Sequence, residues 1–306
     1  MVELRFDQAS RDAQTHTNLS ALRVDPSGLW IAGDETATIE RLAWTGERYD
    51  HERTFHLADY VDLPAGRDDE ADIEGIARAN GWLWAVGSHS LKRRKVKSPD
   101  PAKAAKRLST VIREPNRFIV VRLPLEGPGA VGKGAILTDL ADLLADDPHL
   151  APFTAIPGKD NGLDVEGIAV LGERVFLGLR GPVLRGWAIV LEIDVREDGP
   201  DRLRLDGYRK HFLDLGGLGV RDLCPYGEEL LLLTGPTMDL DGPVRIMRWS
   251  GEGQPEFVAD LPYGVGCDHP EGLAALGDGR LMVVYDSPAP ERLTPEGGVL
   301  ADIIEI

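Results

Sequence analysis

The stretch that decides the fold is residues 163–181, which read LDVEGIAVLGERVFLGLRG. An acidic residue and a Glu-Gly pair open the stretch, and two short apolar runs follow with a turn between them. The same order recurs in residues 72–90 (DIEGIARANGWLWAVGSHS) and 268–288 (DHPEGLAALGDGRLMVVYDSP), and more loosely in residues 18–35 and 220–236. A pattern that returns at intervals of tens of residues indicates a fold built from repeated units.

Each copy of the pattern predicts a β-hairpin. Runs rich in Val, Leu, Ile and Trp flank turn residues such as Asn80-Gly81 and Asp278-Gly279. The second run is almost continuously apolar, as in residues 82–86 and 281–285, which predicts strands buried on both faces. Four-stranded sheets arranged around a central channel would explain the repeat, the turns and the shortage of helix together. We therefore predict an all-β protein with a β-propeller fold.

The five copies predict five blades of four strands. The second interval, from Glu74 to Glu166, is the longest, so a six-bladed propeller with one degenerate blade is the alternative. That interval also contains a basic loop at residues 91–116 and a predicted helical insertion at about 138–152. Residues 2–6 predict a strand that closes the ring by pairing with a strand at 300–306. No linker-like stretch divides the repeats, so we expect a single domain over residues 1–306.

A hairpin returns the chain to the side from which it started, so the first and last positions of every hairpin should lie at one end of the molecule. These start and exit positions are Ser20 and Asp34, Glu74 and His89, Glu166 and Arg180, Asp222 and Gly235, and Glu271 and Asp286. The sequence predicts the functional site at this end.

Acidic side chains dominate the hairpin starts. Glu74, Glu166, Asp222 and Glu271 should converge on the channel axis, where their mutual repulsion calls for a cation or basic side chains. Oxygen ligands of this kind suit Ca²⁺ or Mg²⁺. The alternative is a structural role, in which the carboxylate accepts backbone N–H groups in a turn and the glycine supplies an unusual dihedral. A separate acidic fragment, TMDLDG at 237–242, lacks the other ligands of a Ca²⁺ loop.

Basic residues gather beside the predicted site. Residues 92–107 contain eight basic residues and one acid, and Lys92, Arg93 and Arg94 lead this run directly after the second hairpin. With Arg180, Arg221 and Asp286, these three residues form the predicted contact set for a small anionic ligand, because guanidinium groups bind phosphate and carboxylate in a bidentate manner. A solvated charged loop is the alternative.

The proposed catalytic residues are His89 and Glu166. His89 is the best-placed proton carrier, and Glu166 would hold the cation that polarises a phosphoryl or acyl oxygen or activates water. A hydrogen-bonded structural histidine is the alternative for both His89 and His269.

The net charge of −17 argues against a general nucleic-acid binder. The first ten residues, MVELRFDQAS, lack the apolar core of a signal peptide, and no run approaches 18 apolar residues. We therefore expect a cytoplasmic protein without a membrane partner. Cys224 and Cys267 are expected to be thiols.

Several of these stretches together resemble the domain of unknown function 3616, a family of uncharacterised bacterial proteins. The resemblance rests on DIEG with GSHSLKR, KDNGLDVEG with GLRGPVLRGWA, RKHFLDLGGLGVRDL, GPTMDLDGP, and DHPEG with VVYDSP. It extends over essentially the whole chain and implies a propeller fold without an established activity. The Asp-x-Glu-Gly openings are more distantly similar to those of phytase-like and SdiA-regulated propellers, some of which hold Ca²⁺ near the channel.

Two functions follow as hypotheses. The first is a propeller that holds a divalent cation at the channel mouth and binds, or hydrolyses, a small anionic ester. The second is a non-catalytic propeller that binds a ligand or a protein through the same face. Fold alone does not decide between them.

Overall fold

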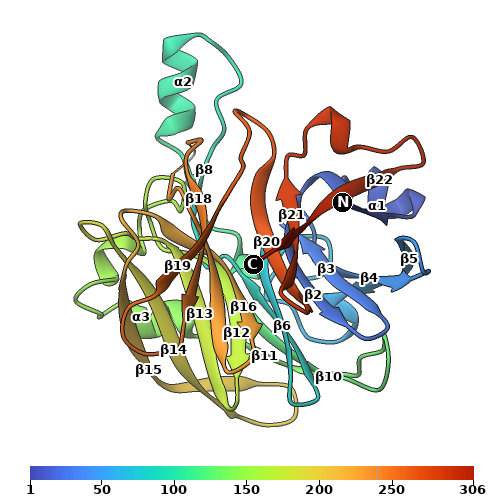
Figure 1. The fold of residues 1–306 in the computed structure, drawn as a ribbon. Coiled ribbons are helices and arrows are strands. Elements are labelled where there is room, and N and C mark those ends of the chain that lie inside the picture. The colour runs from blue at the N-terminus through green and yellow to red at the C-terminus, as the bar shows by residue number, and fades with distance from the viewer. Residues whose placement is uncertain (239) are drawn as a thin grey trace.

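The computed structural model describes residues 1–238 and 240–306; Asp239, within the TMDLDG fragment, lies outside the described residues. Hydrogen bonds join most strands into antiparallel units of four, which are arranged around a common centre (Figure 1). In order from the centre outward, the first three units are β2 (Leu19–Asp25), β3 (Gly28–Gly33), β4 (Thr38–Trp44) and β5 (Tyr49–His56); β6 (Ile73–Ala79), β7 (Trp82–Gly87), β10 (Val120–Pro124) and β11 (Ala135–Leu137); and β12 (Asp164–Leu171), β13 (Arg174–Gly181), β14 (Trp187–Glu197) and β15 (Leu203–Asp214). The next unit is β16 (Gly219–Tyr226), β17 (Glu229–Gly235), β18 (Val244–Trp249) and β19 (Glu256–Leu261), and the last begins with β20 (His269–Gly277), β21 (Arg280–Asp286) and β22 (Gly298–Glu305).

The first strands of these units form an inner ring. Each of β2, β6, β12 and β16 contacts the next first strand along the chain, and β20 contacts β2. Apolar side chains fill the spaces between adjacent units, which explains why the second strands, such as β17, are buried along almost their whole length. The prediction of an all-β, propeller-like fold is confirmed.

The two ends of the chain meet in the last unit. β1 (Val2–Arg5) pairs antiparallel with β22, so that Val2 lies opposite Ala301. β1 also pairs with β5 in a parallel ladder and thereby joins the first and last units into one eight-stranded sheet. The predicted pairing of the two chain ends is confirmed, and Leu4 at its centre is fully buried.

The long interval between β7 and β12 contains an arm that projects from the body (Figure 1). The arm consists of β8 (Lys92–Arg93), the helix α2 (Pro101–Leu108) and β9 (Val111–Ile112). We had predicted a loop here, but Asp100 accepts the N–H groups of Ala102 and Lys103 and Pro101 occupies the first turn, so a helix begins. The later insertion is shorter than predicted: α3 spans Leu140–Leu144, and only its two end residues are buried.

The remaining helical segments are short. They are α1 (Gln8–Asp12) and the 3₁₀ turns Thr15–Thr17, Leu57–Asp59, Pro115–Arg117, Ala151–Phe153 and Pro290–Arg292. Among the described residues, no helix combines the length and the apolar character needed to cross a membrane.

A buried arginine closes the channel below the site. Arg23 extends from β2 and forms an ion pair with Asp222 of β16 at 2.9 Å. Its guanidinium also donates to the carbonyl oxygens of Ile168 on β12 and Leu273 on β20. One side chain therefore ties four inner strands together and gives the channel mouth a closed floor.

Candidate functional site

A β-bulge occurs at the equivalent position of every inner strand, because the pairing with the second strand skips one residue there. The skipped residues are Ser20, Glu74, Glu166, Arg221 and Glu271. These five residues, which we call the mouth ring, are the true counterparts of one another. The prediction that Asp222 belongs to this set is wrong by one residue, since Arg221 occupies the ring position in β16.

Close strand packing explains the glycine that follows each glutamate. A Cβ atom on Gly75 would lie 2.8 Å from the backbone nitrogen of Ile168, and one on Gly167 would lie 2.9 Å from that of Leu223. Neither glycine has a positive φ, so the unusual dihedral that we considered is not the reason for them. The glycines allow neighbouring inner strands to approach.

Asp222 stands where three of the other repeats have this glycine, and it has the structural role that we considered for the glutamates. Its carboxylate accepts the backbone N–H groups of Leu223 and Leu273 at 2.7 and 2.8 Å and pairs with Arg23. Among the described residues, the three ring glutamates accept no such backbone hydrogen bond.

One half of the mouth is neutralised by arginine. Glu166 lies 2.6 Å from Nη1 of Arg180 and 3.6 Å from Nε of Arg221. Arg221 also pairs with Glu271, and Arg180 pairs with Asp164 at 2.5 Å. All of these side chains are buried or nearly so. This half is a closed network of ion pairs between neighbouring inner strands.

The other half of the mouth is acidic. One carboxylate oxygen from each of Asp34, Asp72 and Glu74 lies within 4.8 Å of the others, so the three can share one cation. Asp72 pairs with Arg117, whereas Asp34 and Glu74 form no ion pair with any described residue. The Oδ1 atom of Asp34 is buried and accepts no hydrogen bond from the described part of the chain. We call these three residues the acidic triad.

The protonation of the mouth carboxyls reflects this environment. Burial, followed by the charges of Asp72 and Glu271, raises the pKa of Asp34 to about 8. Burial, Asp72 and Glu166 raise the pKa of Glu74 well above its ordinary value. Burial raises the pKa of Glu166 to about 7 against the opposing effect of Arg180 and Arg221. The triad therefore holds protons near neutral pH unless a cation replaces them.

Asp286 extends the acidic half, as its exit position predicted. Burial and the charge of Glu271 raise the pKa of Asp286 to about 6. His269 lies between two carboxylates, with Nδ1 4.0 Å from Asp286 and Nε2 3.1 Å from Asp241. These contacts give His269 a hydrogen-bonded place at the edge of the site.

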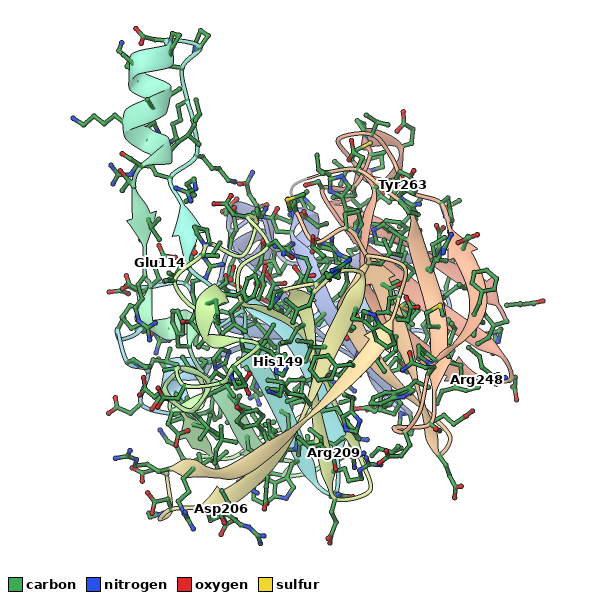
Figure 2. The ribbon with its side chains drawn as sticks, turned by 90° about the vertical axis from the view of Figure 1, so that its left-hand side faces the viewer. Glu114, His149, Asp206, Arg209, Arg248 and Tyr263 are labelled. Atoms are coloured by element: carbon green, nitrogen blue, oxygen red, sulfur yellow. The ribbon has the colours of Figure 1, made fainter. Side chains whose placement is uncertain are left out.

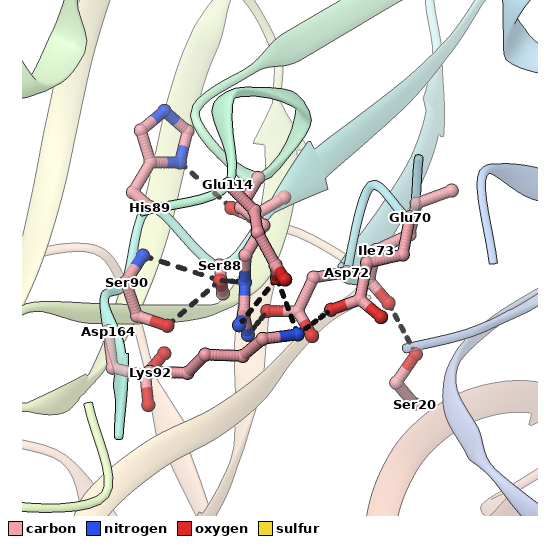
Figure 3. A network of polar contacts seen from close by, with 12 residues as sticks. Ser20, Glu70, Asp72, Ile73, Ser88, His89, Ser90, Lys92, Glu114 and Asp164 are labelled. Carbon is pink, nitrogen blue, oxygen red and sulfur yellow. Dashed lines mark hydrogen bonds and ion pairs between the residues drawn. The ribbon is translucent and has the colours of Figure 1, made fainter. Parts of the chain in front are cut away.

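His89 does not face the acidic triad. Its Nδ1 donates to the carbonyl oxygen of Gly87 at 2.8 Å, and its ring packs edge-on against Phe118. Figure 3 shows the ring turned away from Asp72. The side chain is 2% exposed, and burial lowers its pKa to about 4. The geometry contradicts the predicted role of His89 as proton carrier and supports the structural alternative.

The basic residues at the base of the arm are already paired. Lys92 donates to Glu70 at 2.7 Å and lies 2.6 Å from Glu114 (Figure 3). Arg93 pairs with Asp160 at 2.6 Å. Arg94 forms no ion pair with any described residue. Lys92 and Arg93 therefore fix the arm to the body, which differs from the predicted contact with an anionic ligand.

Comparison with known families places the chain. A family model described as a protein of unknown function (DUF3616) matches residues 18–302. The chain belongs to the DUF3616 family. No curated protein matches its sequence.

Solved structures similar to this DUF3616 protein include several β-propellers and enzymes. Glutaminyl cyclase from Myxococcus xanthus has a TM-score of 0.49 and 10% identity, with 100% of this chain and 96% of that chain covered. The Cps50 (Swd1) β-propeller domain of Myceliophteria thermophila has a TM-score of 0.39 and 9% identity, covering 94% and 96%. The PQQ-bound aldose sugar dehydrogenase from Streptomyces coelicolor has a TM-score of 0.40 and 10% identity, covering 95% and 96%. Similarity at this level carries no argument about activity.

Three residues of the DUF3616 site were missing from the predicted set. Asp34 is a hairpin exit, and Asp72 lies two residues before Glu74, so position alone would have found both. Arg117 precedes a third strand and gives no comparable signal, because only the fold brings it to Asp72.

Proposed function

We propose that this DUF3616 protein is a five-bladed propeller that binds a divalent cation at the channel mouth through Asp34, Asp72 and Glu74. The observation that carries the proposal is the contrast in compensation. Asp34 and Glu74 have no basic partner among the described residues, although the mouth contains three arginines. Buried carboxylates without compensation are costly, and a cation would relieve that cost.

The donor set favours a hard cation. Three carboxylates supply oxygen atoms only, which suits Ca²⁺ or Mg²⁺. Ca²⁺ takes about six to eight oxygen ligands, so water or the oxygen atoms of a ligand would complete the shell. The closed floor formed by Arg23 leaves the mouth as the route of entry. The expected ligand is therefore a small molecule whose anionic oxygens reach the cation.

The direct test is calorimetric titration of metal-free protein with Ca²⁺ and with Mg²⁺, together with thermal melts in each cation and in chelator. The proposal predicts one site per chain and a melting temperature that falls in chelator. Heat of binding that persists in an Asp34→Asn/Glu74→Gln double variant would place the cation elsewhere. Absence of any binding heat would reject the proposal.

Hydrolysis of a small anionic ester is the second candidate, and Glu166 is the observation that favours it. A carboxyl with a pKa of about 7 can exchange a proton near neutral pH, and Glu166 is close enough to Glu74 to raise its pKa. Glu166 would replace His89 as the general base that activates water.

The hydrolysis candidate is tested with p-nitrophenyl phosphate and p-nitrophenyl acetate, each with and without Ca²⁺ or Mg²⁺. Cation-dependent turnover that falls at least about 100-fold in Glu166→Gln is expected, since general-base catalysis contributes about that much or more. Cation binding without turnover of either ester would count against hydrolysis and leave the binding function.

A further inference from the structure

The basic arm (residues 91–113) differs in charge from the rest of the molecule. Residues 92–107 carry eight basic residues and one acid, a net charge of +7. Since the whole chain carries −17, the remainder carries −24. The helix α2 has no buried residue, so packing against the body does not explain the charge of the arm. Figures 1 and 2 show the arm standing clear of the blades.

An apolar patch lies at the same end of the molecule. It consists of four large side chains that are between 44 and 86% exposed: Met238, Leu240, Tyr263 and Val265. The two loops that carry them lie side by side, because Asp241 accepts the backbone N–H of Gly266 at 3.1 Å. Figure 2 shows Tyr263 at the end from which the arm projects. Clustered exposure of large apolar side chains is typical of an interaction surface.

Contacts connect the base of the arm to the patch. Arg93 pairs with Asp160, and Asp160 in turn forms a backbone bridge with Met238. The base of the arm and the patch are therefore joined through one short loop of the third unit. A single elongated partner can contact a basic region and an apolar region at once.

We propose that the basic arm and the apolar patch together form a docking surface for an acidic polypeptide with apolar anchor side chains. The proposal is independent of the cation site. Basic residues on the arm would attract the acidic residues and speed the encounter. The patch would bury the apolar anchors, which supply most of the affinity at interfaces of this kind.

The composition of the surface favours a polypeptide over other anionic partners. A nucleic acid would gain phosphate contacts from the arm, but the charge of −24 on the body would repel it, and the apolar patch would have no counterpart. A membrane would require apolar residues at the far end of the arm. That end, residues 98–101, reads SPDP and contains the acid Asp100.

The experiment is selection of a random-peptide phage library on immobilised full-length protein, followed by anisotropy titration of the enriched peptides. The proposal predicts enrichment in Asp, Glu and large apolar residues. It predicts at least a tenfold loss of affinity in Lys103→Glu/Lys106→Glu. A matched control, Arg204→Glu/Arg209→Glu, makes the same change in net charge on β15; Figure 2 shows Arg209 at the opposite end of the molecule. This control should change affinity less than threefold.

A second pair of variants tests the patch. Val265→Ser should weaken the same peptides at least about fivefold, whereas Phe257→Ser, at a residue 58% exposed on β19, should not. Peptides that lack acidic enrichment, or that bind the arm variant equally well, would overturn the proposal. Tighter binding of a 20-nucleotide single strand or of phosphatidylglycerol vesicles, lost in the arm variant, would also overturn it. Salt-sensitive self-association lost in that variant would support it and identify the acidic polypeptide as a second copy of this chain.

Discussion

The two halves of the channel mouth contain the same residue types at equivalent positions but differ in how their charges are balanced. Glu166 and Glu271 share Arg221 between them, and Arg180 adds a second cation on the same side. Glu74 occupies the same ring position, yet neither it nor Asp34 has a basic partner among the described residues. The difference teaches that a glutamate at a ring position is not in itself a ligand. The neighbouring ring residue decides whether the carboxylate is used inside the fold or remains free for a cation.

The largest expected effect comes from removing the shared arginine. Arg221→Met would leave Glu166 and Glu271 buried without their partner, and we expect a loss of about 3–5 kcal/mol in the free energy of unfolding. Urea denaturation measures this loss, and Ca²⁺ should restore part of it. Arg248→Met, at an arginine whose side chain is 45% exposed, should cost less than about 1 kcal/mol. Equal stability of the two variants would show that the arginine half is not a compensated network.

The second prediction concerns pH. The folded-state pKa of Asp34, about 8, lies above its ordinary value of 3.8, so its contribution to stability is complete below about pH 4 and is lost as the pH rises toward 8. In chelator, stability should therefore fall between pH 6.5 and 8.5, by at most about 1.4 kcal/mol per pH unit for one group. This window lies above the titration of His89, whose folded pKa is about 4.

Melts of wild type and Asp34→Asn across this window measure the effect. The variant should show a smaller decline, and saturating Ca²⁺ should flatten the wild-type curve. Identical slopes for the two proteins in chelator would mean that Asp34 holds no proton there.

The third prediction compares two ring glutamates under the same change of charge. Glu74→Gln should weaken cation binding at least about tenfold, which corresponds to about 1.4 kcal/mol. Glu166→Gln should weaken it less than threefold, because Arg180 and Arg221 already engage that carboxylate. Isothermal titration calorimetry of both variants decides the matter. Equal losses would mean that the two halves of the mouth act alike.

The smallest effect is expected at His89. His89→Gln should change cation affinity less than twofold, because the ring hydrogen-bonds to Gly87 and faces away from the triad (Figure 3). The same calorimetric titration checks this. A tenfold loss, with stability unchanged, would return His89 to the site.

The sequence predicted the architecture better than the identity of the site residues. Hairpin periodicity identified all five inner strands and the pairing of the chain ends, because both depend on local apolar patterns. The error at Asp222 arose because a β-bulge shifts side chains by one residue, and in β16 the ring residue is an arginine. A motif search for acidic residues therefore selected the neighbouring position.

The acidic triad was only partly predictable. Glu74 was identified from its motif, but Arg117 reaches Asp72 through tertiary contact alone, with no spacing in the sequence to reveal it. The arm shows the same limit: its charge was evident, whereas the pairing of Lys92 with Glu70 and Glu114 depends on how the hairpin returns to the body.

Anomalous diffraction from crystals soaked in Mn²⁺, which takes oxygen ligands as Mg²⁺ and Ca²⁺ do, tests the central claim most directly. The account predicts one strong peak bounded by the carboxylates of Asp34, Asp72 and Glu74. A peak between Glu166 and Glu271, or no peak at the mouth, would contradict it.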